Sequence, residues 1–347
     1  MSREAEVVEA GMRIRFARKE DLENIRIFIR DIWDERYSYV THPDLLYYIH
    51  GRNPEAWYVV LEDVETKELL GTMGYILCND LENSDVAVTL LKEKPNVKRM
   101  MGIKMLVFLK ENQPQRVQFS CGIRKYTTNI YNFLQWYTAK LDYYYRIADK
   151  DEYKICQIEN KIIIPAVQGK ASLREYVTFE QLKDNFQAER FVDIRPYKDM
   201  NYLQWRYYDF PYYKYRVWGI EVEKENKALL IGREIKYAGS KMLAIVDFIG
   251  MEEALSEVAT EIQKLIDDNQ YEYVEFMCYG LKQCTLNQAG FVLRDEGDVN
   301  ILPSHFEPYQ RENIDKYFFT TDLSDLRMFR ADSNQDVPRY MDEYLRQ

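Results

Sequence analysis

The stretch from Val97 to Leu106 combines the residue types that bind phosphate groups. It reads Val-Lys-Arg-Met-Met-Gly-Ile-Lys-Met-Leu. It follows an apolar run at 86–91, and its second half opens a helix-like run at 102–112. The first N–H groups of a helix have no backbone partner, and the helix dipole is positive at that end. A phosphate or pyrophosphate can satisfy both. A strand, a basic glycine-containing turn and a helix in this order therefore predict an anion site in front of the helix.

The composition excludes several classes of function. The chain has 347 residues, a formal net charge of −10 and no long stripe of Lys and Arg, so nucleic-acid binding is disfavoured electrostatically. It contains no run of about 18 apolar residues, which a membrane-spanning helix would need. The polar start, Met1 to Glu6, lacks an apolar signal region. We therefore expect a cytoplasmic protein that binds neither nucleic acid nor membranes.

Cysteine and histidine are too sparse to suggest a metal site. The five cysteines are scattered without a C-x-x-C pair, and the chain has only three histidines. Buried free thiols are the expected state of the cysteines, and we expect no metal ion to take part in the function.

Hydrophobic periodicity predicts the elements that position the phosphate-binding turn. After a leader, residues 1–11, that we expect to be disordered, the first half reads as strands alternating with helices. The predicted elements are a strand at 12–17, helices at 22–30 and 43–50, strands at 56–62, 68–77 and 86–91, a helix at 102–112, a strand at 116–121, a helix at 129–141 and a strand at 143–147. Taken alone, this pattern indicates an α/β protein with a mostly antiparallel sheet and helices on its faces.

The second half repeats this order of elements. The predicted elements are a helix at 172–186, an aromatic helix and turn at 199–215, strands at 215–222, 228–236 and 241–249, a helix at 252–268, a strand at 271–278 and a short helix ending at 289. The match indicates a tandem duplication, with one domain at 12–167 and a second at 168–330. The polar tail after Asp322 is predicted to wrap the surface or to fray.

The turn and the order of elements together resemble the GNAT (GCN5-related N-acetyltransferase) superfamily, in its tandem two-domain bacterial form. The segment Arg-Met-Met-Gly-Ile-Lys at 99–104 is similar to the family's pyrophosphate loop, Arg/Gln-x-x-Gly-x-Gly/Ala, and the segment 67–75 resembles its third strand. The resemblance implies two tandem GNAT-like domains of the α/β (α+β) class. Each would be a mixed, mostly antiparallel sheet flanked by helices.

The second half carries a further motif. The segment Trp-Arg-Tyr-Tyr-Asp-Phe-Pro-Tyr-Tyr-Lys-Tyr at 205–215 resembles the Trp-Arg-Tyr-x-x-His-Pro-x-Tyr-x-Tyr signature of a GNAT subgroup associated with surface-polysaccharide genes. Phe210 replaces the histidine of that signature. This resemblance, and no spacing argument, implies an amino sugar as one candidate acceptor.

The resemblance also implies acetyl-CoA, or another acyl-CoA, as co-substrate. In the family, the pyrophosphate sits on the turn before the third helix, and backbone N–H groups of the fourth strand polarise the thioester. Carried onto this sequence, the expected cofactor-binding residues are Leu90, Leu91, Lys98, Arg99, Met101, Gly102, Lys104 and Asn129. Lys104 stands where the family has Gly or Ala, so its side chain either pairs with phosphate or crowds the site.

The equivalent turn of the second half is acidic. Glu252 and Glu253 lie in the first turn of the predicted helix, where they complement the helix dipole themselves and would repel pyrophosphate. We therefore place the cofactor site in the first domain. The second domain is expected to be structural or to form one wall of the acceptor site.

Acyl transfer to an amine requires loss of a proton from the amine, polarisation of the thioester oxygen and protonation of the leaving thiolate. The family pattern Asn…Tyr-x-x-x-Gly-Phe is echoed around Tyr137, which makes Tyr137 the candidate acid, with Trp136 as its competitor if the register shifts. Glu62 and Asp85 are the candidate bases, because both lie near strand ends that face the expected cleft. Asp247 is a further acid that burial would perturb, although a structural Lys or Tyr partner explains it equally well.

Three hypotheses about function follow from the sequence. The first is an acyl-CoA-dependent N-acyltransferase, with acetyl as the expected acyl group, acting on a small-molecule amine such as an amino sugar. The second is a catalytically degenerate GNAT-fold protein that serves in binding or assembly. The third, a FemAB-like transferase that uses aminoacyl-tRNA, would want a long basic channel and a helical arm, and neither is evident. A homodimer is one option for the assembly of the chain.

Overall fold

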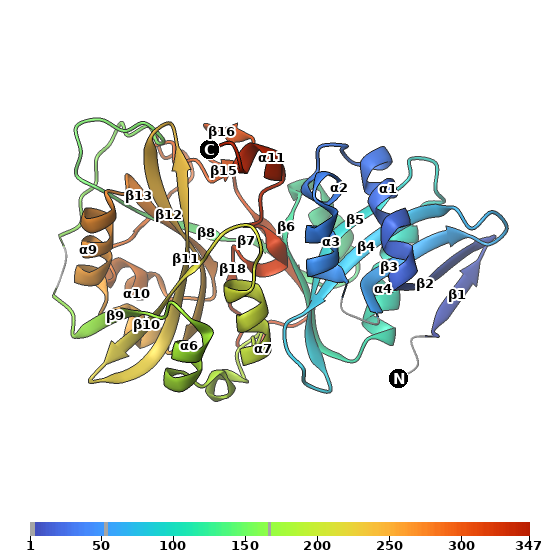
Figure 1. Ribbon diagram of the computed structural model, residues 1–347, viewed down its shortest axis with the longest axis horizontal. Helices are drawn as coiled ribbons and strands as arrows, with labels where there is room; N and C mark the ends of the chain where they lie inside the picture. Colours follow the sequence, from blue (N-terminus) through green and yellow to red (C-terminus); the bar gives the residue numbers. More distant parts are fainter. Residues whose placement is uncertain (1–3, 52–54, 166–167) are drawn as a thin grey trace.

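Two large mixed sheets, packed side by side with helices around them, form the body of the computed structural model (Figure 1). The structure describes residues 4–51, 55–165 and 168–347. The predicted fold class, two tandem mixed sheets flanked by helices, is confirmed.

The first sheet, on the right in Figure 1, carries the predicted phosphate-binding turn. Its strands, in spatial order, are β1 (Glu6–Glu9), β2 (Met12–Arg18), β3 (Glu55–Asp63), β4 (Leu69–Leu77), β5 (Ser84–Glu93), β6 (Gln115–Ile123), β17 (Tyr317–Thr320) and β7 (Tyr137–Lys140). Neighbouring strands are antiparallel except β5 and β6, which are parallel.

The second sheet follows the same plan. Its strands, in spatial order, are β14 (Val292–Leu293), β8 (Asp142–Ile147), β13 (Tyr273–Tyr279), β12 (Ser240–Gly250), β11 (Glu225–Tyr237), β10 (Arg216–Val222) and β9 (Ala171–Glu175). The short strand β18 (Met328–Phe329) also pairs with β13. Again one central pair, β12 and β13, is parallel.

Helices surround both sheets. The α-helices are α1 (Leu22–Ile32), α2 (Ser38–Thr41), α3 (Pro43–His50), α4 (Met101–Asn112), α5 (Thr128–Phe133), α6 (Phe179–Asn185), α7 (Met200–Leu203), α8 (Glu252–Leu255), α9 (Ala259–Asn269), α10 (Gln283–Gln288) and α11 (Met341–Tyr344). Short 3-10 turns lie at η1 (Lys19–Asp21), η2 (Lys125–Thr127), η3 (Ala188–Phe191) and η5 (Asp332–Asn334), a π-helical turn at η4 (Gln204–Tyr208), and a two-stranded ribbon at β15 (His305–Phe306) and β16 (Tyr309–Gln310). None of the helices in the described ranges is long and apolar enough to cross a bilayer.

Each sheet contains a strand from the other half of the chain. Strand β8 pairs with β13 and β14 in the second sheet, while β17 lies between β6 and β7 in the first. Only Leu141 separates β7 from β8, and one residue is too short for the turn that a hairpin needs. Strand β8 therefore continues into the neighbouring sheet instead of folding back. The domain ranges 12–167 and 168–330 stay a prediction, and they do not divide the two sheets.

The described part of the N-terminal leader is a strand, so the expectation of disorder is wrong there. Strand β1 pairs antiparallel with β2, with Glu6 opposite Arg15 and Glu9 opposite Met12. Residues 1–3 lie outside the described residues. The pairing brings the carboxylate of Glu9 to the phosphate-binding turn, as described below.

Residues 326–341 of the C-terminal tail are mostly buried, so the prediction that the tail wraps the surface is wrong for this part. It runs between the two sheets before ending in α11 (Figure 1). Three ion pairs between buried side chains anchor it: Arg330–Glu275, Lys198–Asp332 and Arg206–Asp336. Breaking such a buried pair typically costs about 3–5 kcal/mol. The tail is therefore a fixed part of the fold.

Three predicted helices are shorter than expected. The predicted helix at 129–141 ends at Phe133, because Gln135 has a left-handed φ of 60° and β7 takes up the remainder. The first part of the predicted helix at 172–186 is strand β9, which pairs with β10. The predicted helix at 252–268 is interrupted between α8 and α9. In the case of β9, tertiary strand pairing overrides local helix propensity.

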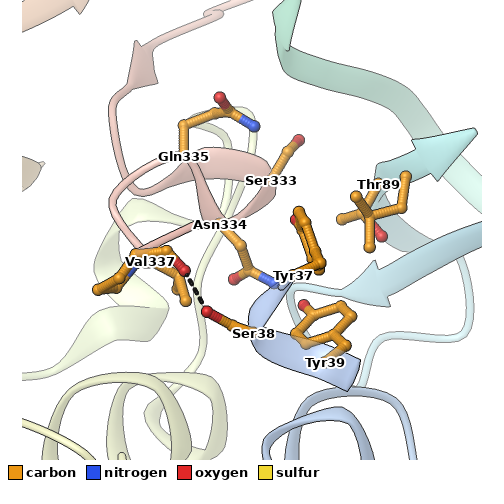
Figure 2. A pocket seen from close by; sticks show the side chains of 10 residues that line it. Tyr37, Ser38, Tyr39, Thr89, Ser333, Asn334, Gln335 and Val337 are labelled. Carbon is orange, nitrogen blue, oxygen red and sulfur yellow. Dashed lines mark hydrogen bonds between the residues drawn. The ribbon is translucent and has the colours of Figure 1, made fainter. Parts of the chain in front are cut away.

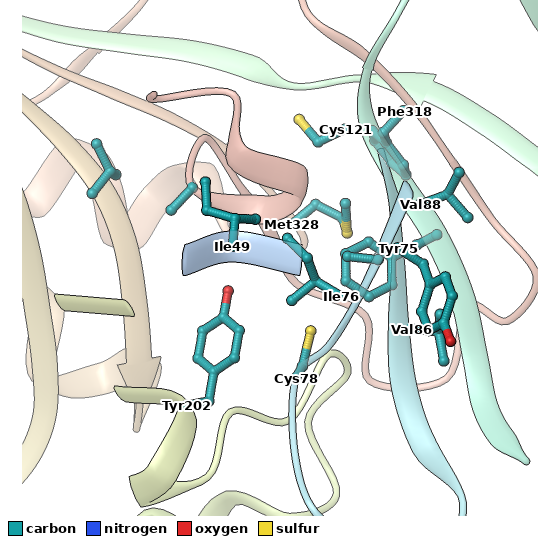
Figure 3. Packing of buried hydrophobic residues seen from close by; sticks show 14 of the residues in the cluster. Ile49, Tyr75, Ile76, Cys78, Val86, Val88, Cys121, Tyr202, Phe318 and Met328 are labelled. Carbon is teal, nitrogen blue, oxygen red and sulfur yellow. The ribbon is translucent and has the colours of Figure 1, made fainter. Parts of the chain in front are cut away.

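One hydrophobic core joins the two halves. A single cluster of buried side chains contains Ile76 and Val86 of the first sheet, Tyr202 of α7, and Phe318 and Met328 from the C-terminal part of the chain (Figure 3). The strand exchange and the tail thus pack both halves into one unit.

Candidate functional site

Strands β5 and β6 diverge in the middle of the first sheet. They pair in parallel from Ser84 opposite Gln115 to Ala87 opposite Phe119. Beyond that point β6 pairs with β17, on its other side. The second part of β5, residues 88–93, therefore leaves its parallel neighbour as it runs toward the start of α4.

Leu90 forms a bulge at the point of divergence. Its φ is +40°, and the pairing of β5 with β4 shifts between Thr89 opposite Gly74 and Lys92 opposite Thr72. Two residues of β5 thus face one residue of β4, and the extra residue of such a bulge is left out of the hydrogen-bond ladder. A backbone N–H that is left out of the ladder can donate to a ligand oxygen. This geometry fits the predicted role of Leu90 and Leu91 in polarising a thioester.

A small cavity lies beside the bulge (Figure 2). Its free volume of about 40 Å³ is room for about three water-sized groups. The lining residues, all uncharged, are Tyr37, Ser38, Tyr39, Thr89, Leu90, Ser333, Asn334, Gln335, Val337 and Pro338. The cavity is thus built by the bulge, by the segment that follows α1 and by the C-terminal tail.

The tail segment that lines the cavity is held in a strained conformation. Ser333 and Asn334 have left-handed φ values of 59° and 61°, and such residues cost about 1–3 kcal/mol each and gather at functional sites. The Cys121 N–H of β6 donates to Ser333 Oγ at 3.0 Å. On the opposite wall, Ser38 Oγ donates to the Pro338 carbonyl at 2.7 Å (Figure 2). Contacts to both the sheet and α2 therefore fix the tail against the bulge.

Two tyrosines form the aromatic wall of the cavity. Burial raises the pKa of the Tyr37 and Tyr39 hydroxyls, so both stay protonated at neutral pH. Behind them, the His50 ring packs between Tyr39 and Tyr58, with ring centroids at 5.6 and 4.6 Å. Burial lowers the pKa of His50 to about 3. The imidazole is therefore neutral over the physiological range.

The predicted anion site at the start of α4 holds a carboxylate of the chain itself. Glu93, the last residue of β5, accepts a hydrogen bond from the Gly102 N–H. A Cβ on Gly102 would come within 2.8 Å of Glu93 Oε2, so a larger residue there would displace this carboxylate. Burial raises the pKa of Glu93. The helix N-terminus therefore attracts an anion, as the sequence predicts, and an internal one occupies it.

The lysines of the turn are paired with the leader strand. Both Lys98 and Lys104 form ion pairs with Glu9, at 3.2 Å for Lys98. Lys104 thus swings away from the helix start instead of crowding it. Arg99 is exposed and has no ion pair within the described parts of the chain. Exposed pairs are worth less than about 1 kcal/mol, so an incoming polyanion can displace Glu9.

Two other predicted cofactor contacts lie away from this region. Met101 is 1% exposed and packs in the core beneath α4, so its side chain is closed to a ligand. Asn129 is exposed on α5, a helix that packs on β7 and β17, at the far edge of the sheet from β5. The structure does not bring either side chain to the bulge.

The structure places Tyr137 too far from the bulge to act as the acid. Tyr137 is on strand β7 and not on a helix, opposite Thr320 of β17, and β17 and β6 separate β7 from β5. Three strand spacings of about 4.8 Å put it roughly 14 Å from β5. Its hydroxyl lies 3.0 Å from the Tyr279 hydroxyl of β13, at the junction of the sheets. Its competitor Trp136 is buried and stacks on Phe319.

The predicted bases are structural acids. Glu62 pairs with Arg15 at 2.8 Å and with Arg13 at 3.5 Å, on the side of β3 next to β2. Asp85 pairs with Arg116 through both carboxylate oxygens, at 2.8 and 2.7 Å. It lies at the start of β5, five residues before Leu90, or about 16 Å along the strand. Neither carboxylate lines the cavity.

Asp247 also has structural partners. Its carboxylate lies 2.6 Å from Lys198 Nζ and accepts a hydrogen bond from the Tyr207 hydroxyl. Both kinds of structural partner expected for this acid, a Lys and a Tyr, are therefore present.

The equivalent position in the second sheet is closed. Strands β12 and β13 pair only from Leu243 opposite Val274 to Ile245 opposite Phe276, and β18 of the tail then pairs with the end of β13. Arg327 Nη1 donates to the Gly250 carbonyl at 2.6 Å. Backbone pairing thus fills the second divergence, whereas the first adjoins a cavity.

Sequence reasoning missed the side chains that line the cavity. Tyr37, Ser38 and Tyr39 follow α1 without a motif, and the tail segment 333–338 is polar and reads as surface. The aromatic motif at 205–215 is linked to this tail, because the buried Arg206 pairs with Asp336.

No protein-family model matches the sequence, and no curated protein matches it. Solved structures do match. The GCN5-related N-acetyltransferase of Anabaena variabilis is 10% identical and aligns over 89% of this chain and 72% of its own, with a TM-score of 0.54. A conserved Enterococcus faecalis protein, described as "Probable N-Acyltransferase", is 9% identical over 90% of this chain and 73% of its own, with a TM-score of 0.50. The chain therefore has the GNAT fold.

Proposed function

We propose that this protein is an acyl-CoA-dependent N-acyltransferase that transfers an acyl group, with acetyl the expected one, to a small amine. The observation that carries the proposal is the Leu90 bulge, which lies where β5 leaves β6, next to a cavity and upstream of a basic helix start. The fold shared with an N-acetyltransferase supports the reaction class.

The donor fits the first half in an extended pose. Its pyrophosphate would lie at the start of α4, near Arg99, Gly102 and the two lysines of the turn. Glu93 at that helix start is three residues from Leu90, or about 10 Å along the strand. This separation leaves room for the pantetheine arm between the pyrophosphate and a thioester carbonyl at the bulge.

The reaction needs one attack and two proton transfers. The amine nitrogen attacks the thioester carbonyl carbon, the C–S bond breaks, the nitrogen releases a proton to solvent, and the leaving thiolate receives a proton. The Leu90 N–H stabilises charge on the carbonyl oxygen. Tyr37 replaces Tyr137 as the proposed proton donor, because Tyr37 lines the cavity and its hydroxyl stays protonated.

The internal carboxylates act as competitors of the donor. Glu93 and Glu9 must leave the helix start and the lysines before a pyrophosphate can occupy them. We therefore expect weak donor binding that strengthens when either carboxylate is neutralised. The degenerate binding or assembly protein keeps these contacts permanently and binds no acyl-CoA.

Isothermal titration of the full chain with acetyl-CoA tests the proposal. The wild type is expected to bind, and Arg99→Ala to bind about tenfold more weakly, because Arg99 is the unpaired cation of the turn. Arg124→Ala is the matched control, since Arg124 is also exposed but lies before η2. Absence of heat and of a thermal shift for wild type, Glu93→Gln and Glu9→Gln alike would reject the acyltransferase.

The acceptor is proposed to be a small-molecule amine, and amino sugars are the first to assay. The motif at 205–215 supports this choice by resemblance. Its Arg206 pairs with Asp336 of the tail that forms the cavity wall, and its Tyr215 donates to the same carboxylate, so the motif acts on the acceptor site through the tail. Release of free thiol with a panel of amino sugars and amino acids measures the preference.

A further inference from the structure

We propose that the cavity receives only the amino group of its acceptor, as a neutral amine of low basicity, without a general base from the protein. This inference rests on the proposed function and concerns the acceptor class of the same site. Its basis is the chemistry of the cavity wall, which consists of hydroxyl, amide and apolar groups only.

No lining residue carries a charge, and the charged groups nearest to the cavity are engaged elsewhere. On the tail, Asp332 pairs with Lys198 at 2.9 Å, and Asp336 pairs with Arg206 and accepts from Tyr215. These carboxylates point into the core between the halves and are buried. Neither is free to take a proton from an amine in the cavity.

The remaining titratable groups around the cavity cannot serve as a base either. Arg339 lies near Tyr37 and pairs with Asp34 at 3.1 Å. His50 lies behind Tyr39, and burial opposes its protonation. On β5, Glu93 lies at the far end of the strand, against Gly102. Among residues 4–51, 55–165 and 168–347, an ammonium group in the cavity would therefore have neither an ion-pair partner nor a proton acceptor.

The magnitudes favour the neutral form. Removing an ammonium ion from water without a partner costs several kcal/mol. The two tyrosine rings could return about 0.5–2 kcal/mol as cation–π contacts. Because the desolvation cost is larger, the acceptor loses its proton to solvent before it binds. The site then selects amines with an appreciable neutral fraction at neutral pH.

The acceptor class follows from the basicity of amines. An α-amino group has a pKa of about 7.7–8.0 and a lysine side chain about 10.4. At pH 7 the neutral fraction of an α-amino group is therefore about a few hundred times that of a lysine side chain. The inference therefore points to α-amino groups, amino sugars and other amines beside electron-withdrawing atoms, and away from lysine side chains and polyamines.

The test compares two acceptors of one size and different basicity with the wild-type enzyme. An amino acid amide offers an α-amine, and an Nα-acetyl-lysine amide offers the more basic amine. For each acceptor, kcat/KM is expected to rise tenfold per pH unit and to level off at the acceptor's own pKa, with no decline above it. An enzyme that binds the ammonium form and uses its own base would instead decline above the acceptor's pKa.

Adding a carboxylate to the cavity wall should let the site accept the charged ammonium form of an amine. Asn334→Asp places a carboxylate in the wall, and Asp tolerates the left-handed backbone of this position as Asn does. We expect the KM for the lysine amine to fall about tenfold and a decline to appear at high pH. Asn334→Gly, which also permits positive φ, is the control without a charge.

The outcomes separate the two proposals. If acetyl-CoA binds and lysine amines react as fast as α-amines at pH 7, the acceptor inference is wrong and the acyltransferase stands. If the profile declines above the acceptor's pKa in the wild type, the inference is also wrong. If acetyl-CoA does not bind to wild type or to the Glu93 and Glu9 variants, both fail together.

Discussion

The carboxylate of Glu93 accepts a hydrogen bond from the N–H of Gly102 at the start of α4. The two residues belong to the strand and helix that frame the phosphate-binding turn. A helix N-terminus favours any anion, and Glu93 supplies one from within the chain. Binding of the proposed donor at this helix start should therefore depend on the charge of this one residue.

Neutralising that occupant is expected to strengthen donor binding. In Glu93→Gln the negative charge beside the pyrophosphate position is lost, which is worth on the order of 1 kcal/mol in a hydrated site, or about fivefold in Kd. Titration calorimetry with acetyl-CoA at low salt measures the change. Glu68→Gln removes a carboxylate that pairs with Lys94 near the same turn and should leave Kd within about twofold. Equal or weaker binding by Glu93→Gln would contradict the model of competition.

The two tyrosine candidates for the proton donor can be separated. Tyr37→Phe is expected to lower kcat by about 10²-fold or more with little change in the Kd for acetyl-CoA, because general acids contribute that much. Tyr137→Phe should keep kcat, since Tyr137 faces Tyr279 at the junction of the sheets. Steady-state assays of thiol release give both values. A loss of kcat in Tyr137→Phe alone would show that Tyr137 is the proton donor, as the sequence predicts.

The buried pair of Arg206 and Asp336 should dominate the stability of the tail. Arg206→Ala leaves Asp336 buried without its cation, which is expected to cost about 3–5 kcal/mol in the free energy of unfolding. Arg174→Ala removes one side of the exposed Arg174–Glu221 pair and should cost less than about 1 kcal/mol. Urea unfolding followed by tryptophan fluorescence compares the two. Similar small losses would mean that the tail is not anchored by this pair.

Asp332 should make the stability fall as the pH rises. Burial raises the pKa of Asp332 to about 6, against about 3.9 in an unfolded chain. The folded state thus binds this proton more tightly than the unfolded state. The contribution of Asp332 to the free energy of unfolding is therefore complete below pH 4 and is lost as the pH rises to 6. The upper bound of this change is about 3 kcal/mol.

Asp332→Asn isolates that dependence. The variant cannot titrate, but its side-chain oxygen can still accept from the Phe329 N–H, as Asp332 does at 2.7 Å. Between pH 4 and 6 the unfolding free energy of the wild type should therefore decrease relative to that of the variant. Parallel curves for the two proteins over this range would show that the Asp332 carboxyl is not perturbed in solution.

Local patterns predicted the elements around the site well. The turn at 97–106 has an apolar strand before it and a helix after it, and such patterns depend only on neighbours in the chain. The predicted helix at 102–112 begins one residue earlier, at Met101. The anion-binding character of its start also follows from local rules, because helix N-termini have unpaired N–H groups whatever surrounds them.

Predictions that depend on contacts between residues far apart in the sequence were less accurate. Tyr137 was placed on a helix, but the strand β17, from near the other end of the sequence, pairs with this segment and draws it into the sheet. The sequence does not show that Glu62 pairs with Arg15 or that Asp85 pairs with Arg116, because these residues become neighbours only across strands. No local signal reports such pairings.

The sequence by itself determined the two mixed sheets, the basic turn before α4 and the absence of a matching turn in the second half. These features arise from hydrophobic periodicity and from the charge of neighbouring residues. Only the tertiary structure decided that β8 and β17 exchange sheets, that the tail forms the wall of the cavity, and that Glu93 occupies the helix start. Each of these depends on contacts between residues far apart in the chain, where burial and ion pairing outweigh local preference. The start of α4 thus holds the protein's own Glu93, and the proposed anionic ligand would have to compete with that carboxylate.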